Sequence, residues 1–338
     1  MKNRRIIYIQ EIKLLDMEKH TFHKGKVKPM KIWPGMTTNE LVNEMGKSGS
    51  FMAGTLSKAV DAYEEMVKTD SYIFLTLSGA LVPAGMNKVI IELIERGLVD
   101  SIVTTGANLV HDMMLAYGGN FYKGDANMKD ELLLEKKIDR IYDVLVSEDD
   151  FQSKFDEPLL ELYDDIAKNN EGKILSISEL INEIAQRIPE EPESILKACY
   201  KNNVKLFVPT IHDSVFGLQA AIYNRKNPGK LNVDVFKDLQ DIWDIRVKEE
   251  KTGAIILGGG VPKNFVFQSF YFSNKTLDNV IQITLDRPET GGLSGAPPEE
   301  AVSWGKINPD GNKIFLVSEV TLAFPLIASA LIERLDKK

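Results

Sequence analysis

The sequence predicts an α/β fold in which helices cover both faces of a doubly wound, mostly parallel sheet. Six short apolar runs recur along the chain, at residues 72–80, 101–108, 205–213, 254–260, 280–286 and 313–320. They are rich in β-branched and aromatic residues and lack strict alternation, which is typical of strands buried on both faces. Helical patterns lie between several of these runs, and such alternation favours a parallel sheet.

The helical patterns, in chain order, cover residues 38–68 with a break at 46–50, then 88–99, 233–245 and 321–335. Residues 1–35 form a predicted N-terminal arm, and residues 36–338 form a single predicted α/β domain. Residues 124–203 are predicted to be rich in charged amphipathic helix, including ELLLEKKIDRIYDVL and ISELINEIAQRI. An inserted helical subdomain is one interpretation of this segment, although no linker marks its boundaries.

Composition excludes several classes of protein. The chain has 338 residues, with 41 Lys and Arg against 49 Asp and Glu, and its net charge of −8 disfavours a nucleic-acid partner. The longest apolar stretch, AFPLIASALI, is too short to cross a membrane, and the N-terminus does not read as a signal peptide. One cysteine and four histidines offer no metal-ligand spacing. We therefore expect a soluble cytoplasmic protein with no metal and no membrane partner.

Small and polar residues follow the predicted strands, where ligands of open α/β sheets collect. Glycine lets a backbone approach a pyrophosphate, helix N-termini supply amide hydrogens, and an acid such as Asp213 or Glu319 can accept from ribose hydroxyls. The chain has neither a GxGxxG fingerprint nor a P-loop, and tight backbone geometry explains any one turn alone. Together the turns favour a dinucleotide site made of Ser78, Gly79, Thr105, Gly106, Ala107, Asp213, Gly258, Gly259, Gly260, Asp286 and Glu319.

The segment SGAPPEEAVSWGKI, residues 294–307, predicts a short helix followed by a lysine. Ser294 is the expected N-cap, the two prolines suit the first turn, and Gly305 ends the helix and releases Lys306. Glu300 and Trp304 are four residues apart and so share a face. A capped surface helix is one interpretation. The other is an amine site in which the indole and the carboxylate hold a ligand ammonium.

In the second interpretation Lys306 forms an imine. A lysine pKa lies at about 10.4, and lowering it by about two units requires about 2.7 kcal/mol of differential interaction. Burial beside another cationic amine supplies an effect of this kind. The segment therefore indicates an enzyme that handles an aliphatic amine.

SGAPPEEAVSWGKI, together with GAIILGGGVPKN and VTTGANLVHD, resembles the deoxyhypusine synthases and their bacterial relatives from about residue 30 onwards. The resemblance implies a Rossmann-like, NAD-dependent transferase that moves the aminobutyl group of spermidine through an enzyme-lysine imine to an acceptor amine. In the namesake enzymes the acceptor is a lysine of a translation initiation factor, and in homospermidine synthases it is putrescine. The resemblance also implies a homotetramer with active sites shared between subunits.

Carried over by motif, Lys306 matches the imine-forming lysine, Trp304 the indole beside the polyamine and Glu300 its carboxylate partner. Asp112 matches an aspartate of the substrate region. The NAD-contacting turns are matched by Thr105, Gly106, Asp213, Gly258 and Gly259, and Glu319 stands where the family has an aspartate near the adenosine.

The departures from the family pattern lie in the amine pocket. Asn264 follows Lys263 where the family has a histidine that helps catalysis, so Asn264 is a candidate catalytic residue. His111 precedes Asp112 where eukaryotic members have a glutamate; it is a candidate general base, or a packed side chain. Leu218 and Leu293 stand where eukaryotic members have acids.

Three functions stay open at this point. The first is protein modification, as in the deoxyhypusine synthases proper. The second is small-molecule polyamine synthesis, such as homospermidine formation. The third is an NAD-binding regulatory protein without catalysis, for which the asparagine at position 264 is the main support.

Overall fold

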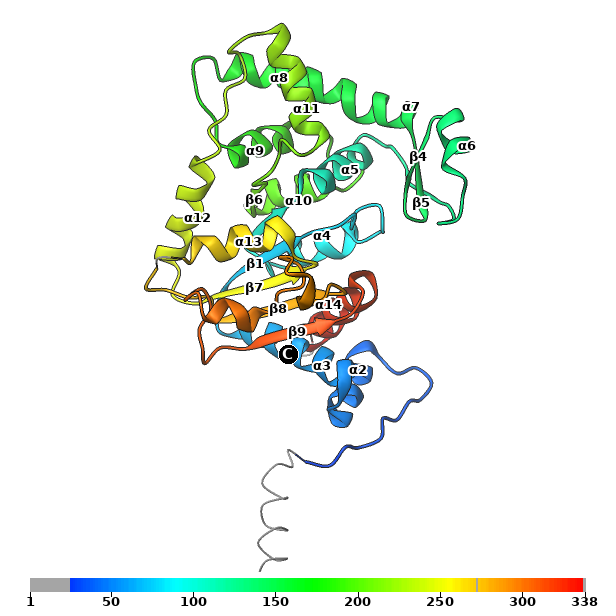
Figure 1. The fold of residues 1–338 in the computed structure, drawn as a ribbon, viewed down its shortest axis with the longest axis vertical. Coiled ribbons are helices and arrows are strands. Elements are labelled where there is room, and N and C mark those ends of the chain that lie inside the picture. The colour runs from blue at the N-terminus through cyan, green and yellow to red at the C-terminus, as the bar shows by residue number, and fades with distance from the viewer. Residues whose placement is uncertain (1–24, 272, 337–338) are drawn as a thin grey trace, which may run out of the picture.

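The computed structural model describes residues 25–271 and 273–336, and its centre is a six-stranded parallel sheet (Figure 1). The order along the sheet is β6-β2-β1-β7-β8-β9. All neighbouring strands run parallel. This is the order of the doubly wound dinucleotide-binding folds, and it reverses between β1 and β7. The six predicted strand runs are confirmed as β1 Tyr72–Leu77, β2 Ser101–Thr104, β6 Lys205–Phe207, β7 Thr252–Leu257, β8 Asn279–Thr284 and β9 Lys313–Val317.

Helices cover both faces of the sheet because side chains along each strand alternate between the two faces. Ile73, Leu75 and Leu77 of β1 belong to one buried cluster, which includes side chains of α3 (Phe51–Lys68), α4 (Asn87–Glu95), α5 (Gly106–Ala116) and α14 (Val320–Asp336). Phe74 of β1 belongs to the other, with side chains of α12 (Lys237–Lys248) and α13 (Gly260–Ser269). The predicted fold class is therefore confirmed.

The predicted break in the first helix is confirmed. Helix α2 (Thr38–Ser48) ends at Gly49, and α3 begins at Phe51. A capping box formed by Thr37 and Glu40 starts α2. Residues 1–24 of the predicted arm lie outside the described residues, and residues 25–36 contain neither helix nor strand.

The connection from β2 to β6 holds the segment predicted to be helix-rich. It contains β3 (Tyr122–Lys123), α6 (Asp130–Glu135), β4 (Ile138–Ile141), β5 (Val144–Ser147), α7 (Glu148–Phe151), the π-helical turn η1 (Gln152–Asp156), α8 (Glu157–Asn169), α9 (Ile177–Arg187) and α10 (Ile195–Asn202). The prediction of one helix across residues 131–145 is wrong, because only α6 forms and the chain then turns back as an antiparallel β4–β5 pair. β-branched residues at 138, 141, 144 and 146 favour strands, and Tyr142 adopts a positive φ of 57° at the turn.

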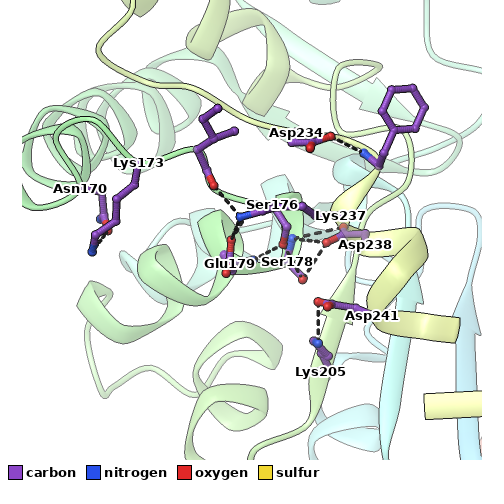
Figure 2. Close-up of polar contacts among 12 residues, drawn as sticks. Asn170, Lys173, Ser176, Ser178, Glu179, Lys205, Asp234, Lys237, Asp238 and Asp241 are labelled. Carbon is purple, nitrogen blue, oxygen red and sulfur yellow. Dashed lines mark hydrogen bonds and ion pairs between the residues drawn. The ribbon is translucent and has the colours of Figure 1, made fainter. Parts of the chain in front are cut away.

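The same connection is bonded to α12 (Figure 2). Asp238 of α12 accepts hydrogen bonds from the Ser178 hydroxyl at 2.8 Å and from the Ser178 backbone N–H at 3.1 Å, at the N-terminus of α9. Next to this connection, Lys205 at the start of β6 donates to Asp241 of α12 at 2.7 Å. Helix α11 (Val215–Lys226) follows β6 and packs on α8. Across residues 25–271 and 273–336, the structure contains no helix with the length and apolarity that crossing a membrane requires.

Candidate functional site

The turns predicted to bind a dinucleotide lie along one edge of the sheet. Leu77 is paired with Thr104 and Leu257, and Thr284 with Val317, so the strands end side by side. The residues that follow them include all of the predicted cofactor contacts, namely Ser78, Gly79, Thr105, Gly106, Ala107, Asp213, Gly258, Gly259, Gly260, Asp286 and Glu319. The edge runs from the turn after β6 to the start of α14 (Figure 1).

The triple-glycine turn lies at the point where the strand order reverses. The Ser78 hydroxyl donates to the Gly259 carbonyl oxygen and so joins the ends of β1 and β7. A Cβ atom on Gly259 would lie 2.4 Å from the Cα atom of Ser294, so the turn packs directly on the backbone of the loop after β8. Gly260 donates its N–H to the Ser294 hydroxyl at 3.0 Å.

This edge has the groups that a dinucleotide requires. Helices α5 and α13 both begin there, at Gly106 and Gly260, and helix N-termini favour phosphate oxygens. Asp213 and Asp286 are exposed. Glu319 accepts from the Thr321 hydroxyl at 2.6 Å and the Leu322 N–H at 2.9 Å. Burial acts to raise the pKa of Glu319, but these hydrogen bonds outweigh it and lower the pKa. The residues present therefore fit the phosphates and hydroxyl groups of a dinucleotide such as NAD.

The segment before Lys306 differs from its prediction. Its helix is a short 3₁₀ turn, η3 (Pro298–Val302), and does not begin at Ser294. Pro297 is extended, with φ −69° and ψ 154°, because a residue that precedes a proline is sterically disfavoured in the helical region. Ser294 instead accepts the hydrogen bond from Gly260, so its predicted role as the N-cap of this helix is wrong.

The turn at Gly305 is confirmed. Gly305 has a φ of 65° and donates its N–H to Val302 O at 2.9 Å, while the Lys306 N–H donates to Ala301 O at 3.1 Å. The Lys306 carbonyl then accepts from Leu277 N–H at 3.0 Å. The backbone at Lys306 is therefore fixed on both sides, which limits where its side chain can point.

Lys306 enters a pocket of about 310 Å³ between α13 and the segment after β8. The residue is only 9% exposed, and its Nζ atom lies 5.4 Å from the ring centroids of both Trp304 and Tyr271. Burial lowers the pKa of Lys306. The remaining residues that line the pocket are Lys263, Asn264, Phe267, Gln268, Leu293, Ala296, Pro297, Glu300 and Ala301.

The structure thus brings together four predicted site residues, Lys306, Trp304, Glu300 and Asn264, but Asp112 and His111 do not line this pocket. Asp112 is fully buried, and its carboxylate oxygens accept from the backbone N–H groups of Ile195 and Leu196, both at 2.9 Å. Burial raises the pKa of Asp112 to about 7, although these hydrogen bonds oppose it. Both carboxylate oxygens of Asp112 therefore hold the N-terminus of α10, and its substrate-binding role stays a prediction.

His111 packs as a half-buried ring, edge-on to Phe121 with 5.4 Å between the centroids. Burial lowers the pKa of His111 to about 4, so the imidazole is neutral at neutral pH. Within this chain the geometry favours the packed side chain over a general base at the Lys306 pocket.

Sequence reasoning missed three residues of α13 and its end that line the pocket, namely Phe267, Gln268 and Tyr271. The signal was present in the spacing, because residues 263, 267 and 271, and likewise 264 and 268, are four apart and therefore share a helix face. Lys263 lies on the same face; burial lowers its pKa to about 8, which the nearby Glu300 carboxylate opposes.

This pocket is suited to amine chemistry. It presents a desolvated primary amine, two aromatic faces that attract cations, and a carboxylate at its wall. Among the described residues, no group of three or more His, Cys, Asp and Glu side chains could hold a metal ion.

Comparison with known proteins agrees with this chemistry. The family model "Deoxyhypusine synthase" matches residues 40–331. The chain is 42% identical to "Probable deoxyhypusine synthase 1" of Methanosarcina mazei over 92% of this chain and 96% of that protein. Its identity to the protein of the same name from Archaeoglobus fulgidus is 39%, over 91% and 98% of the two chains.

A solved structure of a proposed deoxyhypusine synthase from Entamoeba histolytica has the same fold. It superposes with a TM-score of 0.66 at 22% identity, and covers 91% of this chain and 97% of that one. The match to the family model and the identity to the archaeal proteins extend over the sheet, the triple-glycine turn and the lysine pocket. The chain therefore belongs to the deoxyhypusine synthase family, whose members are transferases of an aminobutyl group.

Proposed function

We propose that this chain transfers the aminobutyl group of spermidine, with NAD as cofactor, through an imine on Lys306 to an acceptor amine. The observation that carries the proposal is the buried Lys306 amine between Trp304 and Tyr271, in a pocket with Glu300 at its wall. The loop that contains Leu293 and Ala296 forms part of this pocket, and its Ser294 contacts the triple-glycine turn. One loop therefore borders both the proposed cofactor site and the amine pocket.

Bound NAD would supply a hydride acceptor at the start of the reaction and a hydride donor at its end. The N-termini of α5 and α13 would face its phosphates, and Asp213, Asp286 and Glu319 are the candidate partners of its ribose hydroxyls. At the ends of β1 and β7, Ser78 and the glycines at 258–260 would allow the protein backbone to come close to the bound NAD.

The pocket residues have distinct roles in this proposal. Glu300 pairs with the terminal ammonium of the donor, and the faces of Trp304 and Tyr271 surround cationic nitrogen. Lys306 attacks, as the neutral amine, the imine carbon of the oxidised donor; the bond from that carbon to the leaving nitrogen breaks, and 1,3-diaminopropane departs with a proton. The acceptor amine then displaces Lys306 in the same way. Asn264 remains a candidate for contacts with the reacting nitrogens.

Two acceptors are proposed. A lysine of a translation initiation factor is the first, by family membership. Putrescine is the second; among the described residues that line the pocket, Glu300 is the one carboxylate, while Leu293 forms an apolar wall.

The test is to incubate the protein with NAD and spermidine, alone, with putrescine, or with the factor, and to measure 1,3-diaminopropane and the acceptor product. Release of 1,3-diaminopropane from spermidine is expected only when NAD is present. Product formed with the factor alone removes the small-molecule candidate, and product formed with putrescine alone removes the protein acceptor. The alternative of a regulatory NAD-binding protein requires that no 1,3-diaminopropane appear under any condition.

We further propose a homotetramer with active sites between subunits. Large apolar side chains are exposed near the carboxyl edge of the sheet, among them Leu285 (61%), Trp304 (57%) and Leu322 (66%), and exposed apolar surface of this kind is typical of subunit interfaces. We also propose a cytoplasmic location, because the sequence has a single cysteine and so no disulfide framework of the kind that small secreted proteins carry.

A further inference from the structure

A buried polar network connects the triple-glycine turn to the amine pocket. Lys263 of α13 is 3% exposed, and its ammonium donates to Gln282 Oε1 at 2.9 Å, to Leu293 O at 3.0 Å and to Ala296 O. An ammonium group has three N–H donors, so each of them has an acceptor. All three acceptors are neutral oxygens, and two of them belong to the loop that lines the pocket.

Gln282 completes the network from the sheet. It is fully buried in β8, opposite Ile256 of β7. Its amide nitrogen donates to Gly258 O at 3.0 Å and to Ser294 O at 2.8 Å. A single side chain therefore holds the turn after β7, the loop after β8 and the Lys263 ammonium in one arrangement.

Such a network is not an efficient way to stabilise a core. Well-packed apolar side chains in place of buried charged and polar ones are often neutral or stabilising, whereas each partner left unsatisfied destabilises the fold. What a fully satisfied network supplies is a unique geometry, because its donors and acceptors meet in one arrangement only. Here the network fixes the position of the triple-glycine turn relative to the loop that lines the amine pocket.

We propose that Gln282 and Lys263 are positioning residues that couple the two sides of the active site, so that ligand at the triple-glycine turn and amine in the pocket strengthen each other's binding. The inference deepens the proposed function, on which it rests for the identity of the two ligands. A shift of the turn moves Gly258 O, and through Gln282 it moves Ser294, Lys263 and the pocket loop. Coupling of this kind is typically 5- to 150-fold in affinity, that is, about 1–3 kcal/mol.

The test compares NAD affinity with and without saturating spermidine. We expect at least about a fivefold ratio of NAD Kd values in the natural protein. In Gln282→Met the ratio falls to about one. Gln282→Glu keeps an acceptor for Lys263 but loses both donated bonds, and it gives the same result should the methionine variant fail to fold. A natural protein that binds NAD with no response to spermidine, or variants that keep the full ratio, would overturn the coupling and leave the proposed function standing.

Lys313 provides a matched control. Its ammonium donates to the carbonyl oxygens of Asn308, Pro309 and Gly311, but at the start of β9, on the opposite edge of the sheet. Lys313→Met therefore loses a comparable set of bonds and is expected to keep the wild-type ratio. A ratio that falls equally in Lys313→Met assigns the effect to general loosening of the fold and contradicts the inference.

Amide hydrogen exchange tests the network without any ligand. In Gln282→Met, amide exchange is expected to increase both at residues 258–260 and across residues 285–297. In Lys313→Met, exchange is expected to stay unchanged in both segments. Failure of NAD to bind the natural protein refutes the proposed function, and this experiment still decides the connection between the segments. An increase confined to one segment, or to none, would refute the connection.

Discussion

Two features of the pocket act in opposite directions on the charge of the Lys306 amine. Burial lowers its pKa and so favours the neutral nucleophile. The faces of Trp304 and Tyr271, each 5.4 Å from Nζ, favour a cation at the same position. An amine that attacks as a neutral group and then becomes part of a cationic iminium benefits from both influences, at different steps of the reaction.

Glu300 is expected to act on the substrate and not on the cofactor. Glu300→Gln removes the negative charge and keeps the size of the side chain, so the KM for spermidine is expected to rise about 10-fold or more, the loss expected for a charge-assisted hydrogen bond. The Kd of NAD is expected to change less than twofold. Steady-state kinetics and NAD titration check the two values; Glu299→Gln, on the adjacent exposed residue, serves as the control. A wild-type KM in Glu300→Gln would contradict the assignment.

His111 predicts a pH dependence of stability. Its folded-state pKa of about 4 lies below the ordinary value of 6.5, so between these values the unfolded chain binds more protons than the folded one. Stability is therefore complete above pH 6.5 and is lost as the pH falls towards 4. Between pH 7 and pH 5 the loss is about 1–2 kcal/mol.

Urea unfolding of the natural protein and of His111→Phe at pH 7 and pH 5 measures this contribution. The phenylalanine variant is expected to lack it and so to show a smaller decrease. Unchanged turnover in the same variant would support the packed role, whereas a large loss of kcat without loss of stability would restore His111 as a general base.

At the scale of elements, the triple-glycine turn and the loop after β8 fit together through direct backbone contact. Gly259→Ala would place a Cβ atom 2.4 Å from Ser294 Cα, and neither backbone can easily move. We expect a loss of at least about 2 kcal/mol in the free energy of unfolding, typical of overpacking in a core, and NAD binding weakened about 10-fold or more. Gly292→Ala in the same loop, whose Cβ would meet only Thr290 Oγ1 at 3.5 Å, is the control and is expected to behave as the natural protein. Equal behaviour of the two variants would contradict the close contact.

The spacing of apolar residues predicted the helices and strands that are buried in a regular pattern. It failed where the local backbone geometry decides whether a helix or a turn forms. The central strands β1, β2, β7 and β8 were predictable because both of their faces are covered, which leaves runs rich in β-branched residues. Residues 131–145 were not, since their apolar spacing fits a helix while the chain turns back at Tyr142. The helix expected from Ser294 shortens to η3 because proline restricts the residue before it, and Ser294 is bonded to a turn 34 residues earlier, which no local rule reveals.

At the scale of the whole molecule, the sequence identified most residues of the amine pocket but did not show which side chains contact one another. The motifs around Lys306, Trp304, Glu300 and Asn264 come together in one pocket. The substrate role of Asp112 stays a prediction, because sequence shows an acid but not its direction, and the fold turns this one inward to α10. No sequence motif identified Gln282, because its proposed role depends on three segments that meet only in the fold, at Lys263, Gly258 and Ser294.

The proposed assembly gives a prediction for the intact molecule. Light scattering is expected to yield a mass four times that of the chain, and Leu322→Glu, which places a charge at a 66%-exposed apolar position, is expected to yield smaller species. Replacing Leu134, which is 74% exposed on the small helix α6, with glutamate is the control and should leave the mass unchanged. A monomeric natural protein with full activity would contradict shared active sites.

Borohydride trapping followed by peptide mass spectrometry tests the covalent role of Lys306 most directly. With NAD and spermidine present, reduction is expected to leave an aminobutyl adduct on Lys306, to leave none when NAD is omitted, and to leave none in Lys306→Arg. An adduct on another lysine, or full release of 1,3-diaminopropane by Lys306→Arg, would contradict the account.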